Sequence, residues 1–345
     1  MSKYRLFWPA AALIALLLVN LAISPSFFAI QVRDGHLYGT LIDILRFGAP
    51  LVLVALGMTL VVATGGIDLS VGSVVAIGAA IACAQISTLP DQNAAGGVFG
   101  ALGVALVLCL LLGLCNGFLV SVIGIQPIIA TLILMVAGRG LAQLITGGQI
   151  ITVDSDPFRV LGGGYWFGLP APILIALGVV AATALVVRRS ALGLLVESVG
   201  GNPEASRLAG VRARGLLVLV YVFCGLCAGL AGLMVSSNVS SADGNNAGLW
   251  IELDAILAVV IGGTLLSGGR FSLGGTVLGA LLIQTLSTTV YTVGVPPEST
   301  LLVKALVVTV VCLVQSPAFR AKLRRRRKPP APAPAEPAAK VEVPA

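Results

Sequence analysis

The sequence predicts an all-α polytopic membrane protein, and three observations support this fold class. Of the 345 residues, 57% are hydrophobic and only 10% are charged, whereas soluble domains carry about 25% charged residues. The mean hydropathy is +1.04. Apolar runs of about 20 residues, long enough to cross the hydrocarbon core of a bilayer, recur along the whole chain. The length of the chain therefore reflects membrane spans rather than soluble domains.

Ten apolar segments are candidate transmembrane helices. They cover residues 7–23, 48–66, 70–87, 97–121, 127–146, 166–187, 215–236, 252–267, 274–294 and 299–316. The first segment follows Lys3 and Arg5, as a signal peptide would, but Pro25 occupies the region where a cleavage site needs small residues. We therefore expect the first segment to remain as an uncleaved span.

Positive charges predict the orientation, because Lys and Arg are more frequent in cytoplasmic loops. With a cytoplasmic N-terminus, the outside loops hold only Arg33, Arg46 and Arg159, so both termini are predicted to be cytoplasmic. The predicted regions are an inner N-terminus at 1–6, a transmembrane domain at 7–316 with its largest inner loop at 188–214, and a tail at 317–345. The tail is basic and rich in Pro and Ala, and we expect it to be disordered because it cannot bury a core. Its arginines are expected to lie against lipid headgroups, and nucleic acid is not an expected partner.

A turn motif occurs twice and suggests a pseudo-repeat of two halves, which is common in transporters. The stretch "TGGIDLSVGSV" begins at Thr64, "SGGRFSLGGTV" begins at Ser267, and both are predicted to lie at cytoplasmic turns. Their glycines permit sharp backbone turns, and the polar side chains that follow can cap the next helix. The candidate hinge and cap residues are Gly65, Gly66, Asp68, Ser70, Gly268 and Gly269, with Ser272 as the cap of the second copy.

Asp68 is the only acidic or basic residue between Gly48 and Ile86. We expect it to act mainly as a helix cap beside the glycine hinge. The alternative is that it lines a transport path or contacts a cytoplasmic partner. A lone acid is weak evidence for a proton relay, because relays use chains of ionisable groups.

Two groups of polar residues are candidates for a translocation path. Arg139, Gln143 and Thr146 are spaced four and three residues apart, so they share one helix face. They are suited either to sugar hydroxyls or to packing between helices. The second group, at the start of the eighth candidate span, is Asn245, Asn246 and Trp250, followed by Glu252 and Asp254. It is either a carbohydrate surface or an interfacial tryptophan beside a capped helix start.

Two further polar residues have simpler interpretations. Asn116 is expected to cap the turn after the fourth candidate span. Lys304 is expected to extend its amine to the outer membrane surface.

The sequence offers no candidate catalytic residue and no candidate metal ligand set. It contains no G-x-S-x-G and no H-E-x-x-H, and His36 is its single histidine. No Gly is followed by Lys, so the Walker A loop that cradles ATP phosphates is missing. The six cysteines lie in apolar segments and are expected to act as small packing residues. An enzyme is therefore not expected.

The chain resembles the ribose-type sugar permeases of bacterial ABC importers from about Asp34 to Gln315. The resemblance rests on "ALGMTLVVATGGIDLSVGSVVAIGAA", "NGFLVSVIGIQPIIATLILMVAGRGLAQLITGGQIIT" and "NNAGLWIELDAILAVVIGGTLLSGGRFSLGGTVLGALLIQ". Within that family, "DGHLYGTLIDIL", "GRGLAQLITGGQI" and "NNAGLWIELDAI" are most similar to permeases assigned to galactofuranose uptake. The Arg-rich tail is not part of the family pattern.

The resemblance implies a permease subunit that moves a monosaccharide, galactofuranose first, inward across the bacterial inner membrane. Ribose, xylose, arabinose or another monosaccharide are alternatives. The implied partners are an ATPase subunit that binds ATP and Mg²⁺, a periplasmic sugar-binding protein, and a second permease subunit, identical or related. No cofactor is then expected in this chain. A remote alternative is an ion-coupled secondary transporter, which would need a repeated ionisable site at mid-membrane.

The resemblance also identifies a coupling segment, "ESVGGNPEASRLAGVR", within the large inner loop. Asn202 and Pro203 favour a turn there, followed by a short helix. The residues expected to couple to the ATPase are Glu197, Gly200, Gly201, Asn202, Glu204, Ala205, Arg207 and Gly210.

Overall fold

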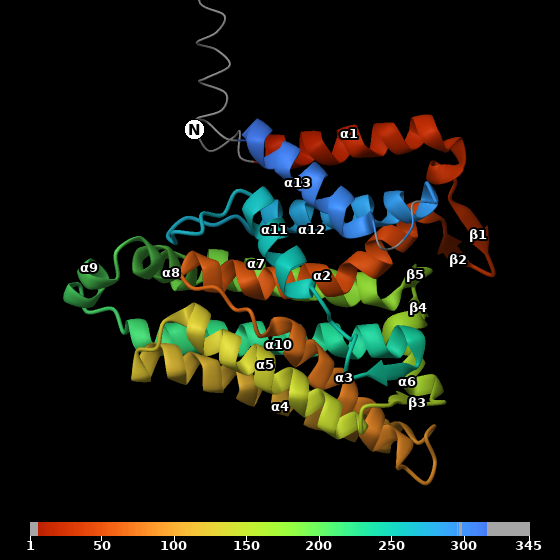
Figure 1. The fold of residues 1–345 in the computed structure, drawn as a ribbon, viewed down its shortest axis with the longest axis horizontal. Helices are drawn as coiled ribbons and strands as arrows, with labels where there is room; N and C mark the ends of the chain where they lie inside the picture. The colour runs from red at the N-terminus through yellow and green to blue at the C-terminus, as the bar shows by residue number, and fades with distance from the viewer. Residues whose placement is uncertain (1–5, 295, 297–298, 316–345) are drawn as a thin grey trace, which may run out of the picture.

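The computed structural model describes residues 6–294, 296 and 299–315, so the predicted tail lies outside the described residues. Helices account for most of the described chain (Figure 1). Each predicted span corresponds to one helix: α1 (Phe7–Ile23), α2 (Thr40–Ala63), α3 (Val71–Ser87), α4 (Ala95–Phe118), α5 (Pro127–Thr146), α7 (Ala171–Arg189), α10 (Ala213–Val239), α11 (Ile251–Ile261), α12 (Leu273–Thr292) and α13 (Thr300–Gln315). The all-α polytopic fold is confirmed.

Shorter elements connect these helices. They are the 3₁₀ turn η2 (Pro25–Phe28), the π-helical turn η3 (Leu119–Ile123), and the helices α6 (Asp156–Gly163), α8 (Leu192–Gly201) and α9 (Pro203–Leu208). Three antiparallel two-stranded ribbons pair β1 (Gln31–Arg33) with β2 (His36–Tyr38), β3 (Ile150–Thr152) with β6 (Ser241–Asp243), and β4 (Tyr165–Trp166) with β5 (Leu169–Pro170). The β4–β5 ribbon occupies residues predicted to begin the sixth span, so α7 starts later than predicted.

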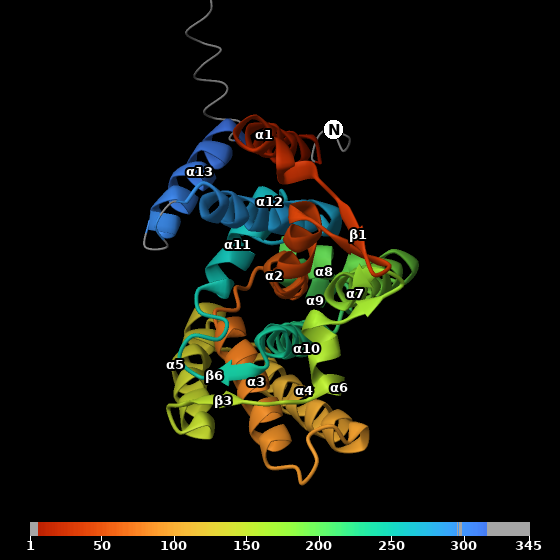
Figure 2. The same ribbon diagram turned by 90° about the vertical axis from the view of Figure 1, so that its right-hand side faces the viewer.

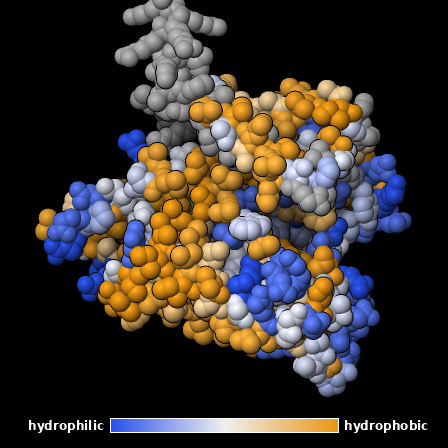
Figure 3. Space-filling model, in the orientation of Figure 1, coloured by the Kyte–Doolittle hydropathy of each residue, from blue (hydrophilic) through white to orange (hydrophobic). Residues whose placement is uncertain are grey.

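The two ends of the bundle differ in structure. The strands β1 to β5 lie at one end, and α8 and α9 lie at the other (Figure 1). In the predicted topology the strands face outside and α8 and α9 face the cytoplasm. Figure 3 shows apolar surface across the middle of the molecule and hydrophilic surface at both ends, as a membrane protein requires.

The core forms around α2 and α10, which lie inside a ring of the other helices when the bundle is viewed from one end (Figure 2). The spanning window of α2 is 83% buried, whereas those of α5 and α7 are each 22% buried. Small residues allow α2 and α10 to approach closely. A Cβ at Gly57 would lie 2.8 Å from the Cα of Cys224 and 3.3 Å from the Cβ of Cys227. Both cysteines are fully buried and unpaired, which confirms their packing role.

Six helices among the described residues are long and apolar enough to cross a bilayer: α2, α4 with η3, α5, α7, α10 and α12. Two helices outside this group of six, α3 and α11, are shorter and begin about midway between the two ends of the bundle (Figure 1). The prediction of a full span at 252–267 is wrong, because α11 ends at Ile261 and an irregular glycine-containing stretch follows. At about 1.5 Å per residue, an eleven-residue helix covers about half of a bilayer core.

Candidate functional site

The two copies of the repeated turn meet each other and α8 at the end of the bundle near α9, which is the inner end in the predicted topology. The N–H of Gly269 donates a hydrogen bond to the carbonyl of Ala63, the last residue of α2, at 2.8 Å. A Cβ at Gly200 in α8 would collide with that same carbonyl. Gly268, at φ +84°, would place a Cβ 2.7 Å from the Gly200 carbonyl and 3.0 Å from the nitrogen of Gly65. We call this contact of three backbone stretches the inner junction.

Asp68 lies just beyond the inner junction and is 2% exposed. Its Oδ1 accepts hydrogen bonds from the backbone N–H of Ser70 at 2.9 Å and from the Ser70 hydroxyl at 2.6 Å. The Asn116 amide donates to the same hydroxyl at 2.8 Å. Asp68 therefore fixes the turn that leads into α3, and Asn116 stabilises this turn through its hydrogen bond to Ser70. The prediction that Asn116 caps the turn after its own helix is wrong.

The second copy of the turn uses Ser272, as predicted. Ser272 is the N-cap of α12, and its hydroxyl accepts a hydrogen bond from the N–H of Gly275 at 3.1 Å. In the first copy Ser70 holds the N-cap position of α3 without a side-chain capping bond. The two copies therefore enter their helices in different ways, one through an Asp-centred turn and one through a serine cap.

The predicted coupling segment forms α8 and α9, and α9 projects from the inner end of the bundle (Figure 1). Asn202 caps α9 by accepting a hydrogen bond from the N–H of Ala205 at 2.9 Å. Glu204 and Arg207 form an exposed ion pair at 2.6 Å. The hydrogen bond from Arg207 holds the pKa of the Glu204 carboxyl below its ordinary range. Gly210, at φ +83°, turns the chain toward α10.

A second polar region, which we call the central cluster, lies where α5 faces the stretch between β6 and α11. The Arg139 guanidinium donates to the carbonyl of Ala247 at 2.6 Å and to that of Asn245 at 3.4 Å. The Gln143 amide donates to Oδ1 of Asn245 at 2.8 Å. Arg139 and Gln143 thus hold this stretch against α5. The predicted polar stripe and the predicted amide-rich group are brought together here.

The other members of the two predicted groups play lesser parts in this contact. Thr146 hydrogen-bonds to the Gln143 carbonyl of its own helix at 3.2 Å. The Asn246 amide donates to the Asp243 carboxylate at 2.7 Å, and this bond holds the pKa of Asp243 below its ordinary range. Trp250 has a left-handed backbone at φ +66°, holds the N-cap position of α11 and is 47% exposed.

Glu252, which the sequence placed beside the second candidate group, belongs to the central cluster. It is 3% exposed, and among the described residues its Oε2 has no hydrogen-bond partner. It points at Gly72 in the first turn of α3, where an added Cβ would collide with Oε2 and lie 2.7 Å from the carbonyl of Gly248. The glycine in the repeated motif is the sequence signal for this close approach. The N-termini of α3 and α11 therefore meet inside the bundle.

The prediction that Lys304 in α13 extends its amine to the membrane surface is wrong. Its Nζ contacts Oδ2 of Asp254 in α11 at 2.8 Å, and the two side chains are only 16% and 23% exposed. Lys304 therefore pairs with a carboxylate inside the bundle.

The central cluster combines guanidinium, amide and carboxylate groups at the ends of two short helices. In membrane transporters, discontinuous helices whose ends lie near the bilayer midplane often form the solute site. The described residues hold no group of three His, Cys, Asp or Glu side chains suited to a metal ion. The arrangement is suited to hydrogen bonding with a polar solute.

Comparisons with known proteins agree with this architecture. The family described as "Branched-chain amino acid transport system / permease component" matches residues 40–312. The galactofuranose transporter permease protein YtfT of Escherichia coli is 48% identical, over 92% of this chain and 93% of its own. The fructose import permease protein FruF of Bifidobacterium longum is 40% identical, over 94% and 92%. The ribose import permease protein RbsC of Haemophilus influenzae is 36% identical, over 88% and 91%.

No solved structure matches the chain at a significant level. The match to the permease family nevertheless covers α2 through most of α13, and so includes both the inner junction and the central cluster. The chain therefore belongs to this family of membrane permease components.

Proposed function

We propose that the chain is the membrane-spanning permease of an ABC importer that moves a monosaccharide inward, with galactofuranose as the first candidate. The relative named for galactofuranose is 48% identical, and other relatives are named for fructose and ribose. Ribose, fructose, xylose and arabinose are therefore the alternative substrates. The observation that carries the proposal is the central cluster, whose Glu252 is buried at the meeting point of α3 and α11.

The chemistry of the central cluster favours a sugar. A sugar hydroxyl both donates and accepts, so a site for it needs both kinds of group. Arg139 is largely occupied by backbone carbonyls, so we assign it the role of positioning the stretch before α11. Glu252 Oε2 and the half-exposed face of Trp250 are the groups left to contact a solute. With so few contacts, binding in the permease is weak, which allows release on the inner side.

Energy for transport comes, in this proposal, from ATP and Mg²⁺ bound by a partner ATPase. The exposed helix α9 docks on that ATPase, and α8 carries the movement to the inner junction. Gly200 contacts Ala63, and Ala63 accepts a hydrogen bond from Gly269. A shift of α8 therefore moves the end of α2 and the turn before α12 together. A periplasmic sugar-binding protein delivers the sugar to a pair of permease subunits, and both termini of each lie in the cytoplasm.

The test is reconstitution of the permease with its ATPase and sugar-binding protein in liposomes. We expect uptake of one radiolabelled sugar from a panel of galactofuranose, ribose, fructose, xylose and arabinose, and we expect it to depend on all three components and on ATP. Uptake of another panel sugar would replace the substrate and keep the class. Failure of the permease to bind any ATPase would overturn the proposal.

An ion-coupled secondary transporter remains the rival class. Liposomes that contain the permease alone distinguish it, because an imposed proton or sodium gradient should then drive uptake. We expect no gradient-driven uptake, and concentrative uptake by the permease alone would overturn the ABC assignment.

A further inference from the structure

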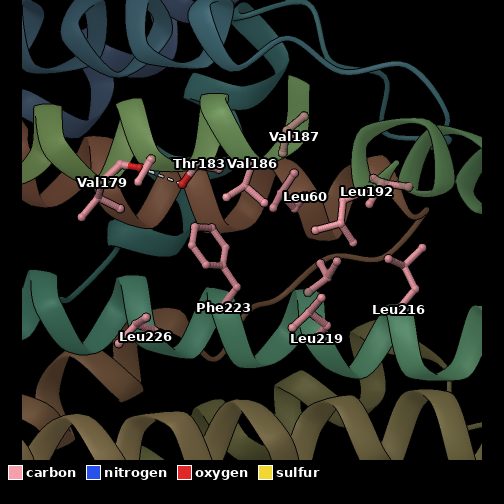
Figure 4. A pocket seen from close by; sticks show the side chains of 13 residues that line it. Leu60, Val179, Thr183, Val186, Val187, Leu192, Leu216, Leu219, Phe223 and Leu226 are labelled. Atoms are coloured by element: carbon pink, nitrogen blue, oxygen red, sulfur yellow. Dashed lines mark hydrogen bonds between the residues drawn. The ribbon is translucent and has the colours of Figure 1, made fainter. Parts of the chain in front are cut away.

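We infer that an apolar groove between α7, α8 and α10 binds one acyl chain of an anionic phospholipid, whose phosphate lies against four arginines at the mouth of the groove. The groove has a volume of about 380 Å³, within the range of roughly 300–1,000 Å³ typical of ligand pockets. Figure 4 shows Phe223 of α10 pointing up toward α7, with Leu192 at the α8 end. This groove is separate from the central cluster and from the proposed sugar path.

The lining of the groove excludes a polar ligand. Its only hydroxyl belongs to Thr183, and that hydroxyl donates to the Val179 carbonyl within α7 at 2.8 Å. Along α10 the lining runs from Leu216 to Leu226, which corresponds to about 15 Å of helix. Half of the hydrocarbon core of a bilayer is also about 15 Å. The groove therefore has the length of one leaflet, and it lies on the leaflet nearer α8.

The mouth of the groove at the α8 end is strongly basic. Arg188 and Arg189 end α7 immediately after the lining residue Val187, and Arg212 and Arg214 precede the lining residue Leu216 at the start of α10. All four arginines are exposed. None of them forms an ion pair or a side-chain hydrogen bond with another described residue.

The cavity continues past the end of the apolar groove. A second cavity of about 540 Å³ shares Leu192, Leu216 and Leu219 with the groove and is also lined by Arg212 and Gly210. An acyl chain in the groove would leave its headgroup in this second cavity. Basic pockets between transmembrane helices on the cytoplasmic side are suited to anionic lipid headgroups.

The other end of the same face provides a contrast. A small cavity of about 140 Å³ there is lined by Arg46, Phe47 and Pro50. Its arginine is already occupied, because it donates to the Gly162 carbonyl at 3.1 Å and also to the Asn238 side chain. Of the arginines beside these two ends of the face, the four near α8 therefore lack a described side-chain partner, and the anionic cytoplasmic leaflet is predicted to lie there.

The experiment measures lipid retained by the full-length permease. The protein is incorporated into nanodiscs with equal amounts of phosphatidylglycerol and phosphatidylcholine, extracted gently, and analysed by native mass spectrometry. We expect retained phosphatidylglycerol on the wild-type chain. The double substitution Arg212→Gln and Arg214→Gln should weaken that preference about fivefold per arginine. Ala182→Phe should displace the acyl chain while leaving every arginine in place.

Arg33→Gln is the matched control, because it removes one exposed arginine from the β1–β2 ribbon at the opposite end. It should leave lipid retention unchanged. Equal retention of both lipids that no arginine substitution alters would overturn the inference. A dimer that Ala182→Phe dissociates, with no lipid bound to the wild type, would also overturn it, because the groove would then be covered by a second copy of the chain.

Discussion

The inner junction and the central cluster are built by opposite means. In the inner junction three backbone stretches touch directly, and glycine is required at Gly200 and Gly268 because a Cβ at either position would separate them. In the central cluster, long side chains of α5 reach across to the backbone before α11. Close-packed backbone transmits displacement with little compliance, whereas side-chain hydrogen bonds can exchange partners. The junction is thus suited to carry motion, and the cluster is suited to meet a solute.

The largest effect is expected at the inner junction, from Gly200→Ala. The added methyl group would collide with the Ala63 carbonyl, and overpacking of this kind costs about 1–3 kcal/mol. Sugar uptake by the reconstituted complex should fall more than tenfold, while ATP hydrolysis persists because the exposed α9 is unchanged. Uptake and ATP hydrolysis measured in the same liposomes test this.

The neighbouring residue provides the control for that experiment. Gly201 has no atom within 4 Å of an added Cβ, so Gly201→Ala should keep nearly normal uptake. If both variants transport normally at equal membrane levels, the junction does not transmit motion. If both fail, helix flexibility rather than contact is what matters.

The next effect concerns the central cluster and Glu252. Glu252→Gln keeps the size of the side chain but removes its charge. If Oε2 accepts a hydrogen bond from the sugar, losing a charged acceptor costs roughly 1.5–3 kcal/mol, so the KM for uptake should rise about tenfold or more with the maximal rate little changed. Uptake kinetics over a range of sugar-loaded binding protein provide the measurement.

Asp254→Asn is a control on the same helix. It removes the negative charge that faces Lys304 and should lower thermal stability without raising the KM. A Glu252→Gln variant with unchanged KM and reduced stability would show that Glu252 only packs against α3.

A smaller effect on transport is expected from Asp68→Asn. Asp68 lies just beyond the inner junction, in the turn that leads into α3. Both hydrogen bonds from Ser70 go to a single oxygen, Oδ1, and an asparagine carbonyl oxygen can accept both. The variant should fold and retain most transport. Asp68→Ala leaves the buried N–H and hydroxyl of Ser70 without that acceptor, which costs about 1–3 kcal/mol. Nearly complete loss of transport in Asp68→Asn, at normal membrane levels, would show that the charge itself is required.

Hydropathy alone located the helices of the ten predicted spans, because each of them is a sustained apolar run. It overestimated α11, because the stretch Gly262–Ser267 that follows the helix carries no charge to mark its end. The caps at Asn202 and Ser272 were predictable because each bonds to a residue three positions away. The partner of Arg139 lies 108 residues away, and no local pattern indicates such a contact. The burial of Glu252 depends on the absence of a side chain at Gly72. The sequence shows this glycine in the repeated motif, but it does not show that α11 packs against it.

The smallest effect is expected at α9, where Glu204 and Arg207 are both exposed. The pKa of Glu204 is lowered in the folded chain by the hydrogen bond from Arg207, so the pair stabilises α9 at a pH above the ordinary glutamate pKa of about 4.3. This contribution is lost as the pH falls through the lowered folded pKa. Because solvent screens an exposed pair, Arg207→Gln should hardly change the melting temperature at neutral pH. The difference between wild type and variant should shrink further below pH 4.3 or so. Melting curves of both proteins across this range, in one detergent, measure it. A large difference at neutral pH would mean that Arg207 has a partner besides Glu204, and that α9 belongs to the rigid inner junction rather than to an independent docking surface.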